Sequence, residues 1–176
     1  RLSSVLSAKF AMEKRNQKNA WLNKAVFESL SVEAKAKYPL ETGGVLMGYF
    51  EEPDNVPVIM YASVPGPNAI HQQNYYVPDQ EFDESIIAAI YRKSGRKITY
   101  LGDWHTHPAP FEELSDKDVK TLKKIAIYKY ARVSMPLMLI LSYHSQWKAS
   151  IWQGNLIKKS FWRKRLITSR LVVRYF

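Results

Sequence analysis

The residues best suited to chemistry lie in one short segment of the chain. His105 and His107 are separated by a single residue and followed by Pro108, and Ser115 and Asp118 complete the pattern His-x-His-x7-Ser-x-x-Asp. Side chains two residues apart in an extended chain point to the same side, so both imidazoles can reach one ion. Asp118 falls on the first turn of a predicted helix and can supply a third ligand. Two imidazoles and one carboxylate, with a fourth position open to water, are typical of a catalytic zinc site.

Each part of this pattern also has a simpler structural interpretation. Ser115 and Asp118 have the spacing of a capping box, which closes the first turn of a helix. A pair of histidines separated by one residue is only mildly suggestive of a metal when it stands alone. The two halves together favour a metal centre, in which a bound zinc would lower the pKa of its water from about 15.7 towards roughly 7.

The chain has no cysteine, and this narrows the chemistry further. Disulfide frameworks, thiol catalysis, iron–sulfur clusters and thiolate zinc sites are excluded, so any metal must be held by His, Asp, Glu and water. Of the other histidines, His71 falls in a polar loop and is expected to be solvated, whereas His144 falls in a predicted hairpin turn. Trp104 adjoins the histidine pair, and we expect it to be a core residue.

Hydrophobic patterning and turn residues predict the elements that must position these residues. Amphipathic helices are predicted over residues 25–37, 81–93 and 115–130. Strands are predicted over residues 43–50, 56–64, 98–104, 134–143, 146–152 and 166–176, with loops over 65–78 and the proline-containing segment 105–114. Helices and strands are interleaved without a regular βα repeat, which favours a single-domain α/β or α+β sandwich over a barrel.

Composition indicates one folded domain. The chain has 176 residues, of which 46% are hydrophobic and 13% aromatic, so a core is expected and intrinsic disorder is not. The longest strongly apolar stretch, residues 136–141, is too short to cross a bilayer. No signal peptide is visible at the start of the sequence. We therefore expect a cytoplasmic protein without stable membrane insertion.

Charge is divided unevenly along the chain. Residues 1–118 contain 13 Lys or Arg and all 16 acidic residues, whereas residues 119–176 contain 13 Lys or Arg and no Asp or Glu. A basic face of this kind can attract an acidic protein, a nucleic acid or a membrane surface. The aromatic and basic residues 161–165 have a composition compatible with binding to single-stranded nucleic acid or anionic lipid. The simpler interpretation is a solvated basic surface without a specific partner.

The histidine segment resembles the JAMM signature of the JAB/MPN metallopeptidases, which reads His-x-His-Pro, seven residues after the second His a Ser, then two residues and Asp. Residues 41–48, Glu-Thr-Gly-Gly-Val-Leu-Met-Gly, match the family's upstream Glu before a small-residue turn into a strand. The resemblance covers residues 20–152. It implies a single MPN/JAB domain with a mixed central β-sheet flanked by helices, similar to cytidine deaminases. The expected division is a basic arm or helix (1–20), the metallopeptidase domain (21–155) and a basic C-terminal strand or extension of that domain (156–176).

The resemblance also implies a role for each matching residue. His105, His107 and Asp118 would bind one Zn2+ ion per chain, and a water would complete the tetrahedron. Glu41 would be the general base that takes the proton of the zinc-bound water during attack and returns it to the leaving amine. Ser115 would donate a hydrogen bond to the oxyanion of the tetrahedral intermediate. Because all five positions are intact, a degenerate scaffold subunit is not expected.

Glu41 carries less weight without the resemblance. It is then a carboxylate near the end of a predicted helix, 64 residues before His105, and a solvated position is the simpler interpretation. Gly43 and Gly44 favour the functional interpretation, because they would let the backbone approach the metal site closely.

Residues 100–108 resemble a bacterial branch of the family whose strand ends in Tyr-Leu-Gly-Glu-Trp-His-Thr-His-Pro. That branch includes stand-alone peptidases of CBASS-type and ubiquitin-like anti-phage operons. It implies a deubiquitinase-like isopeptidase that cleaves the C-terminal junction of a ubiquitin-like protein or a cGAS-like nucleotidyltransferase conjugate. The substrate tail would bind beside a sheet edge as an added strand. This chain departs from the branch at Asp103, where Glu is usual, and in the acidic and apolar segment 109–114.

Two other functions stay open on the sequence. The protein could be a nucleic-acid-associated JAB-domain protein that binds through the basic residues 119–176. It could also be a zinc amidohydrolase of small peptides that uses the same site. Salt-dependent nucleic-acid binding would distinguish the first, and turnover of short peptides without a protein partner would distinguish the second.

Overall fold

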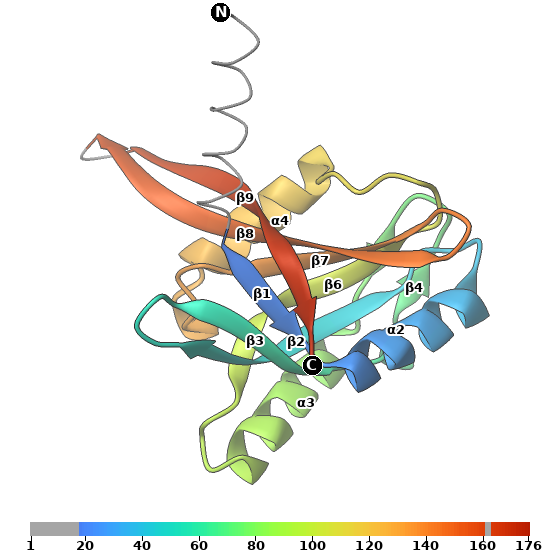
Figure 1. Ribbon diagram of the computed structural model, residues 1–176, viewed down its shortest axis with the longest axis horizontal. Coiled ribbons are helices and arrows are strands. Elements are labelled where there is room, and N and C mark those ends of the chain that lie inside the picture. The colour runs from blue at the N-terminus through green and yellow to red at the C-terminus, as the bar shows by residue number, and fades with distance from the viewer. Residues whose placement is uncertain (1–17, 161–162) are drawn as a thin grey trace, which may run out of the picture.

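The computed structural model describes residues 18–160 and 163–176, which are built around a sheet that closes on itself (Figure 1). Within those residues the closed sheet has the strand order β1-β3-β2-β6-β7-β8-β9. The first strands are β1 (Asn19–Leu22), β2 (Gly43–Glu51) and β3 (Val56–Ala62), and the later ones are β6 (Thr99–His107), β7 (Leu137–Tyr143), β8 (Trp147–Ser160) and β9 (Arg163–Tyr175). Strand β1 closes the sheet because it pairs in parallel with both β3 and β9. Strands β6 and β7 are also parallel, and the other neighbours are antiparallel, so the sheet is mixed.

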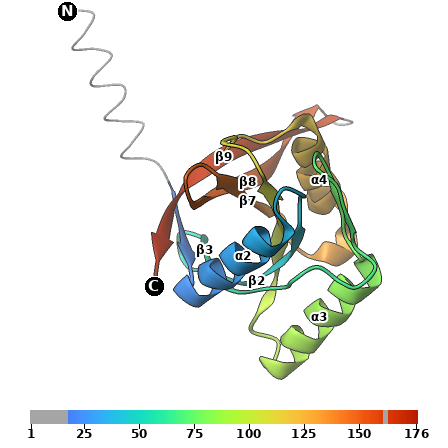
Figure 2. The same ribbon diagram turned by 90° about the vertical axis from the view of Figure 1, so that its right-hand side faces the viewer.

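Helices surround this sheet on different sides (Figure 2). They are α2 (Lys24–Lys37), α3 (Gln80–Lys93) and α4 (Asp116–Ile127), and a 3-10 turn, η1 (Lys129–Ala131), follows α4. Helix α2 contacts β3 and β7, α3 contacts β2 and β6, and α4 contacts β7, β8 and β9. A small separate hairpin is formed by β4 (Ile70–His71) and β5 (Tyr76–Val77). None of the described helices combines the length and apolar character needed to cross a bilayer.

The sequence predicts the fold class and most elements, and the differences have physical reasons. A mixed α/β fold with one central sheet flanked by helices is confirmed, but the sheet is a closed barrel rather than a sandwich. Closure depends on pairing between β1 and β9, at opposite ends of the described chain, which local patterning does not reveal. The prediction that the chain is irregular from residue 105 is wrong at its start, because β6 continues through His107 and ends before Pro108. The helix predicted over residues 115–130 ends at Ile127.

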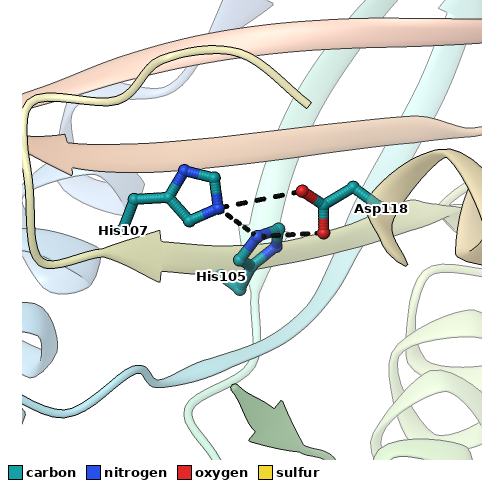
Figure 3. Close-up of side chains that lie close together, drawn as sticks. All are labelled: His105, His107 and Asp118. Atoms are coloured by element: carbon teal, nitrogen blue, oxygen red, sulfur yellow. Dashed lines mark hydrogen bonds and ion pairs between the residues drawn. The ribbon is translucent and has the colours of Figure 1, made fainter. Parts of the chain in front are cut away.

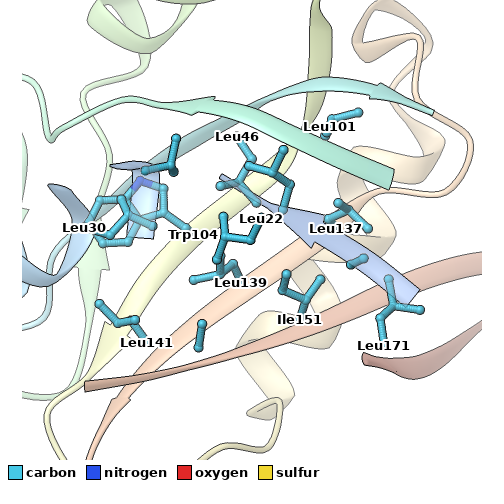
Figure 4. Close-up of a cluster of buried hydrophobic side chains, with 14 of the residues drawn as sticks. Leu22, Leu30, Leu46, Leu101, Trp104, Leu137, Leu139, Leu141, Ile151 and Leu171 are labelled. Carbon is cyan, nitrogen blue, oxygen red and sulfur yellow. The ribbon is translucent and has the colours of Figure 1, made fainter. Parts of the chain in front are cut away.

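Strand β7 explains how the helices are held on the sheet. Its residues Leu137–Tyr143 form a nearly continuous apolar run that is buried on both faces, as is typical of a central strand covered on both sides. Leu137, Leu139 and Leu141 enter the main core with Leu30 of α2 (Figure 4). The alternate residues Met138 and Ile140 pack on the other face with Leu122 of α4. Each face of β7 therefore anchors a different helix.

A bulge in β6 determines which face of the sheet carries the histidines. Leu46 of β2 lies opposite Gly102 and Met47 lies opposite Tyr100, so Leu101 is an extra residue in β6. Gly102 has a φ of +148°, and a Cβ there would lie 2.0 Å from the carbonyl oxygen of Leu137. Because the bulge shifts the alternation, Leu101 and Trp104 both belong to the main core. The histidines that follow Trp104 are turned to the opposite face, towards α4.

Two expectations concern the ends of the domain. A basic arm is expected over residues 1–20, of which residues 1–17 lie outside the described part of the chain. Strand β1 of the closed sheet begins at Asn19. Strand β8 runs from Trp147 to Ser160, across the expected boundary at residue 155. In the aromatic and basic segment 161–165, residues 161 and 162 lie outside the described part of the chain. The division of the chain at these boundaries stays a prediction.

Candidate metal centre

Three potential metal ligands meet where the end of β6 faces the start of α4 (Figure 3). The Nε2 atoms of His105 and His107 are 3.0 Å apart. His105 Nε2 lies 3.3 Å from Oδ1 of Asp118, and His107 Nε2 lies 3.7 Å from Oδ2 of the same carboxylate. All the ligand atoms of this group lie within 4.8 Å of one another. The spacing predicted from the sequence therefore brings the two imidazoles and the carboxylate together.

This donor set fits a tetrahedral divalent metal. Ligands at about 2.0 Å from a tetrahedral ion are about 3.3 Å from one another, which is close to the nitrogen–nitrogen and nitrogen–oxygen distances in the cluster. Burial lowers the pKa of His105 to about 4, and this keeps the ring neutral and its lone pair available near neutral pH. Two neutral imidazoles and a carboxylate suit zinc and other first-row divalent ions.

The tautomer of His107 is set by a contact outside the cluster. Its Nδ1 lies 2.8 Å from the carbonyl oxygen of Phe111, so Nδ1 carries the proton and donates it to that oxygen. Nε2 of the same ring is then unprotonated and presents its lone pair to the cluster. The rings of His107 and Phe111 are also close, with centroids 5.5 Å apart and planes inclined by 31°. A backbone carbonyl thus orients one of the potential metal ligands.

Asp118 is positioned by the capping box that its spacing from Ser115 predicts. The Oγ of Ser115 accepts a hydrogen bond from the Asp118 N–H at 3.2 Å, and Oδ2 of Asp118 accepts one from the Ser115 N–H at 2.7 Å. The capping and metal interpretations therefore do not exclude each other, because the same contacts start α4 and aim the carboxylate at the histidines. Since the Ser115 hydroxyl accepts this bond, its own proton is available to donate to another group.

Glu41 lies beside the cluster, just before β2. Gly43 pairs with His105, and the Thr106 N–H donates to the carbonyl oxygen of Thr42 at 2.8 Å, so Glu41 comes next to the end of β6. Burial raises the pKa of the Glu41 carboxyl to about 7, Lys117 lowers it and Asp118 raises it further. Among the residues of the cluster, Asp118 is the one whose charge acts on this carboxyl.

The β4–β5 hairpin holds the backbone of Glu41, and sequence reasoning missed its role. The Glu41 N–H donates to the carbonyl oxygen of Gln72 at 2.7 Å, and His71 Nδ1 donates to the carbonyl oxygen of Glu41 at 2.9 Å. The expectation that His71 is merely solvated is therefore wrong. Lys117 of α4 reaches the same hairpin, with its Nζ 3.5 Å from the carbonyl oxygen of Tyr76. The polar sequence of this loop contains no periodic signal that could have revealed these contacts.

Two further expectations have clear outcomes. Trp104 is 1% exposed and donates from Nε1 to the Ser63 carbonyl oxygen at 2.9 Å, which confirms it as a core residue. Gly43 and Gly44 of β2, expected to let the backbone approach the metal site closely, lie against neighbouring atoms of the domain. A Cβ at Gly43 would lie 2.4 Å from the carbonyl oxygen of Trp104 and 2.8 Å from the Tyr76 ring, and one at Gly44 would lie 2.4 Å from Ser63 Oγ. These glycines make room for packing against neighbouring residues of the domain.

Comparisons with known proteins agree with this arrangement. Residues 23–163 match the family of prokaryotic homologs of the JAB domain. The chain is 36% identical over 155 residues to the "Probable metalloprotease y4qB" of Sinorhizobium fredii, and the aligned region covers 87% of this chain and 94% of that protein. It is 28% identical over 118 residues to a CD-NTase/cGAS isopeptidase of Escherichia coli, and this aligned region covers 67% of this chain and 69% of that protein. The solution structure of protein DSY2949 from Desulfitobacterium hafniense shares the fold, with a TM-score of 0.62 at 18% identity over 89% of this chain and 92% of that one.

The family match and the site coincide. The matched residues 23–163 include both histidines, the capping box and Glu41, and they span the described sheet from β2 to β8. The relative from Sinorhizobium fredii is similar over nearly the whole of both chains, so the likeness is not confined to a short motif. This chain therefore belongs to the prokaryotic JAB-domain family and is a metallopeptidase of the JAMM type.

Proposed function

We propose that this chain is a zinc-dependent isopeptidase that cleaves the C-terminal junction between a cGAS-like nucleotidyltransferase, or a ubiquitin-like protein, and its conjugated target. The observation that carries the proposal is the meeting of two imidazoles and a carboxylate at the end of β6. Glu41 lies two residues before Gly43, which pairs with His105. Relatives named as CD-NTase/cGAS isopeptidases support the nucleotidyltransferase as the substrate. A role in anti-phage defence would follow from that substrate class.

The metal would be held by His105, His107 and Asp118. When bound, zinc supplies Lewis-acid polarisation of the scissile carbonyl and lowers the pKa of water to near neutrality. The protein's part is to keep the three ligands aimed at one point. The Phe111 carbonyl holds the His107 ring, and the Ser115 N–H holds the Asp118 carboxylate.

Glu41 would move the proton. Its carboxylate accepts a proton from the attacking water and returns it to the leaving amine, so the same group acts as base and then as acid. The raised pKa of about 7 suits both steps at neutral pH, because each protonation state is well populated. The charge of a bound cation would lower this pKa and favour the base form before attack.

Ser115 would stabilise the charge that develops on the substrate. Its hydroxyl accepts the Asp118 N–H, which fixes the oxygen and leaves the proton free to point at the oxyanion. Removing one such donor from an acyl-transfer site typically lowers the rate by about 10² to 10³. The capping role and the proposed catalytic role therefore use different parts of one hydroxyl group.

A substrate trap tests the proposed function. Zinc-loaded Glu41→Gln protein is immobilised, a lysate of the native host is passed over it, and retained proteins are identified by mass spectrometry. We expect a conjugated nucleotidyltransferase or ubiquitin-like protein, which is released in cleaved form when active enzyme is added. Glu28→Gln, on an exposed position of α2, is the matched control and should release its substrate instead of retaining it.

The alternatives give different results in the same experiment. Retention of nucleic acid without a conjugate, or proteins that active enzyme leaves uncleaved, would contradict the isopeptidase proposal. Turnover of short synthetic peptides at rates equal to those of any captured protein would favour a small-peptide amidohydrolase.

A second candidate function, nucleic-acid binding, is favoured by an exposed surface at the end of α4. Tyr128 and Tyr130 are 58% and 77% exposed, with ring centroids 5.6 Å apart. Exposed cations lie close to them in the sequence at Lys124, Lys129 and Arg132. Aromatic faces stack on bases and cations attract phosphates, so this surface suits a single strand.

Oligonucleotide binding at several salt concentrations tests this candidate. We expect that a labelled single strand binds at about 0.1 M salt, that affinity falls steeply as salt rises, and that Tyr130→Ser weakens it. Absence of binding at that salt concentration, or an unchanged affinity in Tyr130→Ser, would remove it.

A further inference from the structure

We propose that Glu112 is a positioning residue of the metal centre: it fixes loop 108–114 on strands β8 and β9 and thereby holds the Phe111 carbonyl that orients His107. This inference rests on the proposed metal-dependent function. It also gives a purpose to the acidic and apolar segment 109–114, in which the chain departs from the bacterial branch that it resembles.

The Glu112 carboxylate is held by side chains from β8, β9 and the turn before β8. Its Oε1 accepts from Lys148 Nζ at 2.7 Å and lies 3.1 Å from His144 Nε2. Its Oε2 accepts from Ser150 Oγ at 3.2 Å and from the Arg170 guanidinium. The Glu112 side chain is only 15% exposed, so these donors hold the carboxylate in a largely enclosed position.

The backbone of Glu112 is fixed as well. Its carbonyl oxygen accepts from Trp152 Nε1 at 3.0 Å. The Arg170 guanidinium that binds the carboxylate also lies over the Trp152 ring, 5.9 Å from its centroid. Side chain and main chain of one residue are thus attached to neighbouring points on β8 and β9.

The peptide bond carries this constraint to the metal ligand. The carbonyl group of Phe111 and the amide nitrogen of Glu112 belong to one planar peptide unit, so fixing Glu112 restricts the direction of that carbonyl. The carbonyl accepts the Nδ1 proton of His107 at 2.8 Å. Partners of this kind that orient metal-binding histidines typically change metal affinity by about 10- to 100-fold when they are lost.

Leu114 packs against the Leu122 cluster at the far end of the loop, but other features nearer Phe111 hold the loop only weakly. Residues 108–115 form neither helix nor strand, so no ladder of backbone hydrogen bonds fixes them. The Phe111 side chain is 48% exposed, and burial therefore holds it only in part. The adjacent Glu113 is 59% exposed and has a longer ion pair with Arg170, at 3.7 Å. Glu112 is thus the better-anchored acidic residue of the loop.

The test compares Glu112→Gln with Glu113→Gln as the matched control. Zinc affinity is measured by competition with a chelator, and the His107 tautomer is measured in the metal-free protein from its ring 15N shifts. In Glu112→Gln we expect affinity to fall by about 10- to 100-fold and His107 to lose its uniform Nδ1-protonated form. Glu113→Gln should match the wild type in both measurements.

Arg170→Gln provides a second approach to the same contact if Glu112→Gln folds poorly, and its effects should have the same direction. Wild-type zinc affinity together with an unchanged His107 tautomer in either folded variant would overturn the proposal. Failure of the wild-type protein to bind zinc would instead contradict the proposed function, and the tautomer measurement would still test the role of Glu112.

Discussion

Two polar clusters adjoin loop 108–114, and they differ in the source of the positive charge that balances each one. In the first, the potential ligand atoms of His105, His107 and Asp118 lie within 4.8 Å of one another. In the second, Glu112 already receives charged donors from Lys148 and Arg170. Burial lowers the pKa of His105 to about 4, whereas hydrogen bonding by Lys148 contributes most to lowering the pKa of Glu112 to about 2.

The difference separates a site that can receive a cation from a contact that is complete. Electron-pair donors that face one another repel unless a proton or a metal lies between them. The Glu112 cluster has its counter-charges built into the chain and therefore serves to attach the loop. The strongest tests of this comparison change one cluster and leave the other intact.

The largest effect is expected from removing a ligand of the first cluster. His105→Ala leaves one imidazole and one carboxylate, and we expect zinc affinity to fall by more than about 100-fold, beyond the effect of losing an orienting partner. Equilibrium dialysis with metal analysis measures the bound zinc.

The matched change in the second cluster is His144→Ala. This residue contacts Glu112 and is 37% exposed, so its loss should alter zinc affinity within about fivefold. Equal losses in the two variants would contradict the distinction between the clusters.

A large effect on stability is expected at the bulge that turns the histidines outward. Gly102→Ala places a Cβ 2.0 Å from the Leu137 carbonyl oxygen in a backbone with a φ of +148°. We expect the free energy of unfolding to fall by about 1 to 3 kcal/mol from the backbone strain alone, and by more because of the close contact. Urea unfolding measures the loss, and metal binding by the folded fraction reports on the ligands.

Gly95→Ala is the control for backbone conformation. Gly95 has a φ of +64°, but a Cβ there would meet no atom within 4 Å. Its cost should be limited to about 1 to 2 kcal/mol for the left-handed conformation. If Gly95→Ala were as destabilising as Gly102→Ala, the close approach of β6 to β7 would not explain the glycine.

Acid should weaken the second cluster through the protonation of Glu112. Its pKa in the folded protein, about 2, lies below its ordinary value of 4.5, so the stabilisation is present above pH 4.5 and is lost as pH falls towards 2. The difference in unfolding free energy between wild type and Glu112→Gln should therefore shrink over that range. Urea titrations at several pH values measure it, and a difference that grew as pH fell would contradict the assignment.

The smallest effect is expected from an outer member of the same cluster. Lys148 is 58% exposed, so Lys148→Gln should lower the unfolding free energy by about 1 kcal/mol or less. High salt should reduce the difference further. Lys120→Gln, at an exposed position of α4, is the control and should be neutral. A loss from Lys148→Gln larger than that from Glu112→Gln would show that the carboxylate is not the centre of the cluster.

The proximity of the three side chains in the first cluster could be predicted because their geometry is local. Two histidines on one strand share a face by alternation, and Asp118 follows within a single loop and helix turn. Glu41 could be proposed only through the family resemblance, since it reaches the site by pairing of β2 with a strand about 60 residues later. Its proposed role as base had no local signal.

The second cluster could not be predicted because its members are distant in the sequence. Glu112 meets Lys148 and Arg170, which are 36 and 58 residues later, and such contacts exist only after β8 and β9 pair. Closure of the sheet by β1 and β9 is unpredictable for the same reason. The extra residue Leu101 in β6 likewise depends on the register with β2.

The most direct test of the central claim is cleavage of a defined conjugate by zinc-loaded wild type and Glu41→Gln at matched zinc content. The substrate is a cGAS-like nucleotidyltransferase joined through its C-terminus to a lysine side chain, and single-turnover rates are measured at neutral pH. The account predicts cleavage at the junction by the wild type and a rate lower by about 10² to 10⁴ in Glu41→Gln, with zinc retained. Equal rates in the two proteins, or a zinc-loaded wild type that leaves both this conjugate and its ubiquitin-like counterpart intact, would contradict it.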